Sequence, residues 1–180
     1  MARPMPSPLH RLRSALEADF EFEHELGSGG LGVLWLAREK ALNRRVVIKT
    51  VREDQLSSAL AARFLREAEL LARMNDSRVV RVYRAGEVGG IPYCVMEHLD
   101  GPNLAERLAR GPLRWSELRR LGRDLLRGLA ALHATGIVHR DLKPANILWL
   151  PDRAVVIDLG LARATHVERG DAVLALERAG

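Results

Sequence analysis

The segment His139–Asn146 brings an aspartate, a lysine and an asparagine close together in the sequence. The carboxylate of Asp141 could accept the proton of an attacking hydroxyl group and orient that group. The ammonium group of Lys143 could neutralise charge on a phosphoryl group in transfer. The amide oxygen of Asn146 and the carboxylate of Asp158, which follows a short apolar run, could bind a hard cation such as Mg²⁺. These residue types favour metal-assisted phosphoryl transfer.

A glycine-rich run between two expected strands is the second candidate, and it consists of Gly27, Ser28, Gly29, Gly30, Leu31 and Gly32. Glycine residues let a backbone approach a polyanion closely and point its N–H groups toward it. A floppy hairpin is the frequent alternative for a run of this kind taken alone. A dinucleotide-binding fingerprint should open a helix, whereas this run opens a strand. The setting therefore favours a phosphate-covering loop.

Lys49 and Glu67 form a candidate pair. Lys49 lies near the end of the β-branched run Val46–Val51, where a buried ammonium group needs an anion nearby. Glu67 is expected to share a helix face with Phe64 and Leu71, because residues three and four apart lie on one face. A carboxylate on an apolar face predicts an ion pair with Lys49, which would hold the ammonium group toward phosphate oxygens.

Five strands and one helix are expected to position these residues in the first half of the chain. Alternating or β-branched apolar runs predict the strands, at residues 20–23, 33–37, 46–51, 79–83 and 91–96. Apolar residues at helical spacing predict a helix over residues 56–74, and glycines predict a turn at 86–90.

The second half of the chain is expected to be mostly helical. Asn103 followed by Glu106 fits a capping box that opens a short helix. Leucines at helical spacing predict a longer helix over 118–134, and two apolar runs predict a hairpin of residues 147–150 and 155–157. A weaker helical pattern covers residues 172–178. Together the elements predict an α+β fold.

Residues 1–19 are expected to form an N-terminal extension that is partly disordered. Met1–Pro8 is rich in proline and lacks the apolar core of a secretory signal. Leu9, Leu12 and Leu16 then recur at helical spacing, which predicts a short amphipathic helix that packs on the following domain.

The composition excludes several classes of protein. A hydrophobic content of 47% over 180 residues is typical of a globular protein. The net charge of +5 makes nucleic acid the first partner to consider, but the arginines are scattered and no basic run occurs, so we expect no nucleic-acid binding. The single cysteine, Cys94, excludes an intrachain disulfide and is expected to be buried. No apolar stretch approaches a membrane span, and we expect a cytoplasmic protein.

In type and order, these motifs resemble those of the eukaryotic-type Ser/Thr protein kinase family in its bacterial branch. The resemblance covers about residues 20–164. It implies a kinase domain over residues 20–180. Residues 20–97 would form an N-terminal lobe with a five-stranded antiparallel sheet and one helix, and residues 98–180 a truncated, mostly helical C-terminal lobe.

The resemblance implies roles for individual residues. Four match catalytic positions of the family, namely Lys49, Glu67, Asp141 and Lys143, and two match its metal ligands, Asn146 and Asp158. A larger set matches the positions that bind ATP: Leu26, Gly27, Ser28, Gly29, Gly30, Leu31, Gly32, Leu34, Lys49, Glu97, Leu99, Asn146 and Asp158. The implied cofactors are ATP and Mg²⁺, and the implied substrate is a Ser or Thr hydroxyl group of a protein.

The sequence also departs from the family pattern. Leu159 replaces the Phe of the metal motif, and no Ala-Pro-Glu motif or full activation segment follows Gly160. The helix over 118–134 should therefore expose apolar surface, which a partner or a second copy could cover. Two alternatives stay open at this point: a non-catalytic nucleotide-binding module or truncated fragment, and a small-molecule kinase whose final helix at 172–178 replaces the activation segment.

Overall fold

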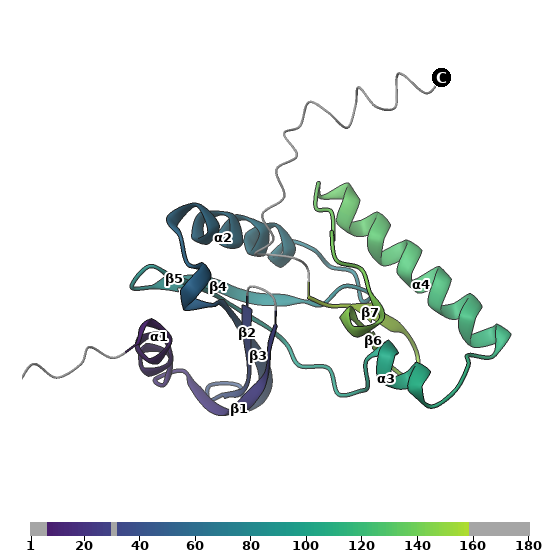
Figure 1. Ribbon diagram of the computed structural model, residues 1–180, viewed down its shortest axis with the longest axis horizontal. Coiled ribbons are helices and arrows are strands. Elements are labelled where there is room, and N and C mark those ends of the chain that lie inside the picture. The colour runs from purple at the N-terminus through teal and green to yellow at the C-terminus, as the bar shows by residue number, and fades with distance from the viewer. Residues whose placement is uncertain (1–6, 30–31, 159–180) are drawn as a thin grey trace, which may run out of the picture.

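The computed structural model describes residues 7–29 and 32–158, which form an antiparallel sheet flanked by helices and a smaller, more helical part (Figure 1). The five strands lie in the order β1-β2-β3-β5-β4. Their bounds are β1 Phe20–Gly29, β2 Gly32–Glu39, β3 Arg44–Val51, β4 Val82–Val88 and β5 Ile91–Glu97. This confirms the predicted α+β fold with a five-stranded antiparallel sheet and its helix.

A helix covers each face of the sheet; the two are α1 Pro8–Leu16 and α2 Ser58–Ala72. Leu12 of α1 packs in one core cluster with Ile48, whereas Phe64 of α2 packs in another with Val47. Successive side chains of a strand point to opposite faces, and the residues of β3 from Val46 to Val51 are all buried, so this strand is covered on both sides. The predicted packing of the N-terminal helix on the following domain is confirmed.

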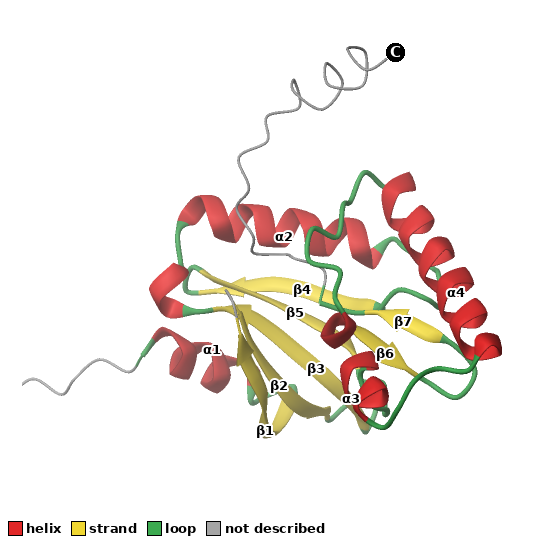
Figure 2. Cartoon of the chain, turned by 45° about the vertical axis from the view of Figure 1, so that its right-hand side comes forward, coloured by secondary structure: helices red, strands yellow, loops and turns green. Residues whose placement is uncertain are grey.

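The second half contains the predicted short helix after Asn103, the predicted long helix and the predicted hairpin. Its elements are α3 Leu104–Ala109, α4 Trp115–Ala134, the 3₁₀ helix η2 Pro144–Asn146, β6 Ile147–Trp149 and β7 Ala154–Val156. A further 3₁₀ helix, η1 Glu53–Gln55, precedes α2 in the first half. α4 packs along β7 (Figure 2). Asn103 and Glu106 form the predicted capping box, with the Asn103 Oδ1 atom accepting from the Glu106 N–H at 2.9 Å.

The prediction for the fourth strand was wrong in its position. A strand was expected at 79–83 and a turn from Gly86, but β4 begins at Val82 and passes through Gly86. Val79 and Val80 instead pair with Val156 of β7, Val79 as an isolated bridge and Val80 by a hydrogen bond of 3.0 Å. Gly86 fits inside the strand because the ring of Tyr93 on β5 occupies the space a Cβ would need, with the Tyr93 hydroxyl 3.0 Å from that position.

A buried carboxylate joins the two halves of the molecule. Asp124 on α4 is 2% exposed and accepts hydrogen bonds from the Arg78 Nε atom and the Ala154 backbone N–H, each at 3.2 Å. The Val156 N–H also donates to the Arg78 carbonyl at 2.7 Å. The segment between α2 and β4 is thereby fixed to both α4 and β7, the two elements that lead into the candidate site.

Several predictions fall on residues that the structure does not describe, among them Gly30 and Leu31, the motif residues Leu159 and Gly160, and the helix expected at 172–178. The domain bounds at residues 20 and 97 also stay predictions. Within residues 7–29 and 32–158, no helix combines the length and the apolar character needed to span a membrane.

Candidate active site

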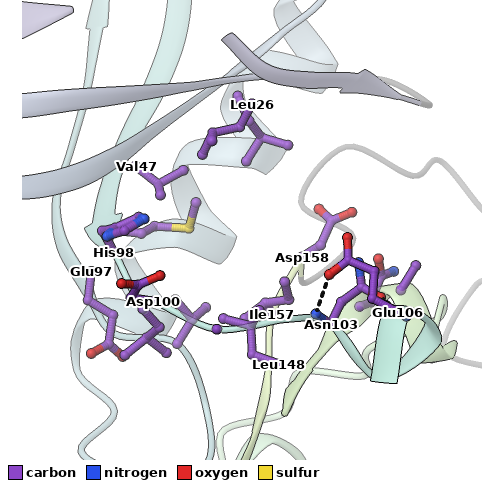
Figure 3. Close-up of a pocket in the computed structure, with 17 residues that line it drawn as sticks. Leu26, Val47, Glu97, His98, Asp100, Asn103, Glu106, Leu148, Ile157 and Asp158 are labelled. Carbon is purple, nitrogen blue, oxygen red and sulfur yellow. Dashed lines mark hydrogen bonds between the residues drawn. The ribbon is translucent and has the colours of Figure 1, made fainter. Parts of the chain in front are cut away.

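A pocket of about 380 Å³ lies between the sheet and the β6–β7 hairpin. Leu26 and Val47 line it on the side of the sheet, and Leu148 and Ile157 line it on the side of the hairpin (Figure 3). Asp158 lies at one end (Figure 3). The pocket therefore has two apolar walls and an acidic end, which suits a flat, apolar ring that carries a polar extension.

The pocket brings together six of the thirteen residues that were predicted to bind ATP. The predicted residues that line it are Leu26, Leu34, Glu97, Leu99, Asn146 and Asp158. Leu99 is the second residue after the end of β5, so its backbone groups lie beyond that strand. Glu97 uses its side chain elsewhere, because its Oε1 atom accepts from the Arg81 N–H at 2.7 Å.

The polar end of the pocket differs from the prediction in one ion pair. Lys49 is 5% exposed, and its Nζ atom pairs with the Oδ1 atom of Asp158. This structure does not form the predicted Lys49–Glu67 pair, because the Oε1 atom of Glu67 accepts from the Nε atom of Arg63 at 3.0 Å. A buried ammonium group needs one close anion, and the carboxylate of Asp158 meets that need here.

Asp141 is the centre of a compact hydrogen-bonded loop. The Lys143 Nζ atom lies 2.9 Å from the Asp141 Oδ2 atom. The Asn146 Nδ2 atom donates to the Asp141 carbonyl at 2.9 Å and lies 3.2 Å from its Oδ2 atom. Pro144 occupies the first turn of η2, where its fixed φ angle suits a helix start. The loop thus places the carboxylate, the ammonium group and the amide that the sequence predicted to act together.

His139 ties this loop to the end of β7, a role that sequence reasoning missed. Its buried ring contacts the Ile157 carbonyl through the Nε2 atom at 3.1 Å, and its Nδ1 atom accepts from the Asp141 N–H at 3.3 Å. Burial lowers the pKa of His139 below its ordinary value. The neutral ring can serve both contacts, and it holds Asp141 beside the residue that precedes Asp158.

Asn146 and Asp158 fit the predicted role of Mg²⁺ ligands. The amide nitrogen of Asn146 makes both of its bonds to Asp141, so the oxygen is the end of that amide left to face a cation. Asp158 adds a carboxylate from the same pocket. Mg²⁺ is commonly held by one or two carboxylates together with phosphate oxygens and water, so this small oxygen donor set suits it.

Further pocket residues were missed as binding residues. Val80 and Leu148 belong to runs that were read only as strands, and Asn103 and Glu106 only as a helix cap. In the structure the same capping box lines the pocket, with Glu106 accepting from the Asn103 N–H at 3.1 Å. The sequence held a signal for this role, because the capping box of Asn103 and Glu106 comes a few residues after Glu97 and Leu99, which were predicted to bind ATP.

Comparison with known proteins settles the family. The family model described as protein kinase domain matches residues 20–175. The chain belongs to the protein kinase family. The kinase chain is 37% identical over 163 residues to the serine/threonine-protein kinase pkn2 of Myxococcus xanthus, covering 88% of this chain and 20% of that protein. It is also 37% identical over 167 residues to the serine/threonine-protein kinase PknB of Mycobacterium tuberculosis, covering 89% of this chain and 26% of PknB.

Solved structures confirm the kinase fold. The PknI kinase domain of M. tuberculosis superposes with a TM-score of 0.71 at 24% identity, over 81% of this chain and 59% of that one. The structure described as the PpkA-294 apo form gives a TM-score of 0.69 at 29% identity, with the same two coverages of 81% and 59%. The family match and the sequence relatives confirm the resemblance to bacterial Ser/Thr kinases. The chain matches about three fifths of each solved domain.

Proposed function

We propose that this chain carries the ATP-binding and phosphoryl-transfer site of a protein serine/threonine kinase. The observation that supports this most strongly is the convergence of Asp141, Lys143 and Asn146 beside the Lys49–Asp158 pair at the acidic end of an apolar pocket. Phosphoryl transfer depends almost entirely on positioning and charge stabilisation, and these are the groups that supply both.

The adenine ring would lie between the two apolar walls. Leu26 and Leu34 would contact one face of the ring, and Leu148 and Ile157 the other. The backbone at Leu99 would exchange hydrogen bonds with the ring edge. The glycine-rich run would cover the phosphates with backbone N–H groups, as proposed for Gly27, Ser28, Gly29, Gly30, Leu31 and Gly32.

The phosphates would extend toward Lys49 and Asp158. Asn146 and Asp158 would hold Mg²⁺, which supplies neutralisation of charge on the phosphate oxygens when bound. Lys49 would place a buried positive charge beside the same oxygens. In this working arrangement Glu67 would pair with Lys49, as the corresponding glutamate and lysine do in the kinase family, because Asp158 would then hold the metal.

Asp141 would orient the incoming hydroxyl group and accept its proton as the new P–O bond forms to the γ-phosphorus of ATP and the bond from that phosphorus to the β-phosphate oxygen breaks, which releases ADP. Its carboxylate is already held by Lys143 and Asn146, so little reorganisation is needed. Lys143 would stabilise charge on the transferred group. The acceptor is proposed to be a protein Ser or Thr hydroxyl, in keeping with the names of the relatives, and the location to be the cytoplasm.

A non-catalytic nucleotide-binding module is the second candidate, favoured by the surface of α4. Trp115, Leu118 and Leu126 are 70%, 47% and 71% exposed, and the chain matches 59% of a solved kinase domain. Solvent-exposed apolar side chains of this size on one helix indicate a surface that further polypeptide covers. In such a module, a partner or a second copy would cover α4.

One experiment distinguishes a catalytic Ser/Thr kinase from a non-catalytic nucleotide-binding module. The chain is incubated with Mg-ATP labelled at the γ-phosphate, alone and with a mixture of Ser- and Thr-containing peptides, beside the variant Asp141→Asn. Label should appear on Ser or Thr in the native chain, and Asp141→Asn should lose most of it. Equal label in both proteins would exclude catalysis at Asp141. Nucleotide-dependent thermal stabilisation without any transfer would support the non-catalytic module.

A further inference from the structure

Arg63 holds the carboxylate that Lys49 would need in a working kinase. Arg63 and Glu67 are one turn apart on α2, and their Nε and Oε1 atoms lie 3.0 Å from each other. Their side chains are 27% and 23% exposed, so water screens this pair less than it screens a pair on an open helix surface. The carboxylate of Glu67 is therefore engaged within its own helix.

The buried ammonium group of Lys49 needs a nearby anion, and in this structure Asp158 provides it in place of Glu67. The two side chains form an ion pair, and Lys49 is almost fully buried. A metal ion on Asp158 would compete with Lys49 for that carboxylate. The buried ammonium group would then depend on the phosphate oxygens and on Glu67, because it has little access to water. Nucleotide binding and the release of Glu67 from Arg63 are thus coupled through charge.

The guanidinium group of Arg63 is incompletely paired in its present position. Its Nη2 atom is buried and has no hydrogen-bond partner among the described residues, whereas its Nε atom donates to Glu67. A guanidinium group binds a carboxylate best through two parallel N–H groups, and this pair uses one. Because the Arg63–Glu67 contact lacks this two-bond geometry, Glu67 gives up no optimal contact when it leaves Arg63 for Lys49.

We propose that Arg63 is a positioning residue that competes with Lys49 for Glu67 and so weakens the binding of Mg-ATP. This rests on the proposed function, since it assigns Glu67 to Lys49 in the nucleotide-bound state. The apparent affinity of a site falls in proportion to the fraction of molecules in the competent state. Removing Arg63 raises that fraction.

The test is the affinity of the full chain for Mg-ATP, measured by calorimetric titration. The variant Arg63→Gln keeps a long side chain of similar helix propensity and removes the charge. We expect it to bind Mg-ATP about threefold to tenfold more tightly than the native chain, as estimated from the strength of partly buried pairs one turn apart. The control is Arg66→Gln, the same change at an exposed position of the same helix, which should leave the affinity unchanged.

A double substitution separates competition from a general effect on the helix. In the background Glu67→Gln, the change Arg63→Gln should no longer alter the affinity, because the two effects share one carboxylate. An equal affinity of native and Arg63→Gln chains, or a gain that persists in Glu67→Gln, would overturn this inference alone. A native chain that binds no Mg-ATP would overturn the proposed function and the inference with it.

Discussion

Replacing Asp124 should destabilise the chain far more than replacing other acidic side chains of the same region. Asp124 is buried and receives one hydrogen bond from Arg78 and one from the Ala154 backbone. The variant Asp124→Ala leaves both donors without this acceptor. Asp124→Asn keeps an acceptor oxygen but loses the charge, so it should be milder.

The size of the effect follows from the two donors. A hydrogen bond to a charged group contributes about 1.5–3 kcal/mol, and the lower end applies here because Arg78 is a quarter exposed. Ala154 is fully buried, so its N–H left without a partner should cost about 2 kcal/mol. We therefore expect Asp124→Ala to lower the free energy of unfolding by about 3–4 kcal/mol and Asp124→Asn by about 1–2 kcal/mol.

The assay is equilibrium unfolding in urea at neutral pH, followed by far-ultraviolet circular dichroism, with free energies from linear extrapolation. A loss of about 3 kcal/mol should also lower the Tm by about 6–12 °C for a chain of this size. The control is Asp152→Asn, since this side chain is 67% exposed and forms an ion pair with its neighbour Arg153. The urea concentration at the midpoint of unfolding should be the same for Asp152→Asn and for the native chain.

A difference below about 0.5 kcal/mol between Asp124→Ala and the native chain would refute the reasoning, because surface substitutions have effects of that size. It would mean that water or another group replaces the carboxylate at no cost. The same result would remove the argument that Asp124 fixes β7, and with it Asp158, to α4.

Two further predictions concern the histidine of the site and the glycines of α4. Because burial lowers the pKa of His139 below its ordinary 6.5, the unfolded chain binds a proton there that the folded chain does not. The free energy of unfolding should therefore fall as the pH drops from about 7 through 6.5. In the variant His139→Gln, the free energy from urea unfolding should depend less on pH. An equal dependence on pH in both proteins would count against this role of His139. A Cβ at Gly128 would lie 3.1 Å from the Arg78 carbonyl, whereas Gly122 has open space. Gly128→Ala should thus lower the Tm, and Gly122→Ala should raise stability by about 1 kcal/mol; shifts of the same sign would contradict the packing of α4.

Residues close together in the sequence were the ones whose spatial relation could be predicted. Asp141, Lys143 and Asn146 lie in one short loop, and their geometry is set by the chain between them. The same holds for the capping box of Asn103 and Glu106. Sequence patterns also predicted most of the strands and the two helices that pack on the sheet, since the period of apolar residues identifies strands and helices.

Relations between distant residues could be predicted only in part. The choice of Lys49 between two carboxylates depends on where β7 brings Asp158 and on the neighbour Arg63, which competes for Glu67. A local sequence pattern shows neither how close Asp158 comes to Lys49 nor whether Glu67 pairs with Arg63. The position of β4 was misjudged for a similar reason, because Gly86 reads as a turn residue unless the ring of Tyr93 beside it is known.

The central claim is that the apolar pocket and its acidic end form one site for a nucleotide and a metal ion. Crystals of the chain grown with Mn²⁺ and a non-hydrolysable ATP analogue would test it directly by anomalous diffraction. We predict an anomalous peak in contact with Asp158 and the Asn146 amide oxygen, and a base between Leu26 and Leu148. A nucleotide bound elsewhere, or a Mn²⁺ peak away from both ligands, would contradict the account.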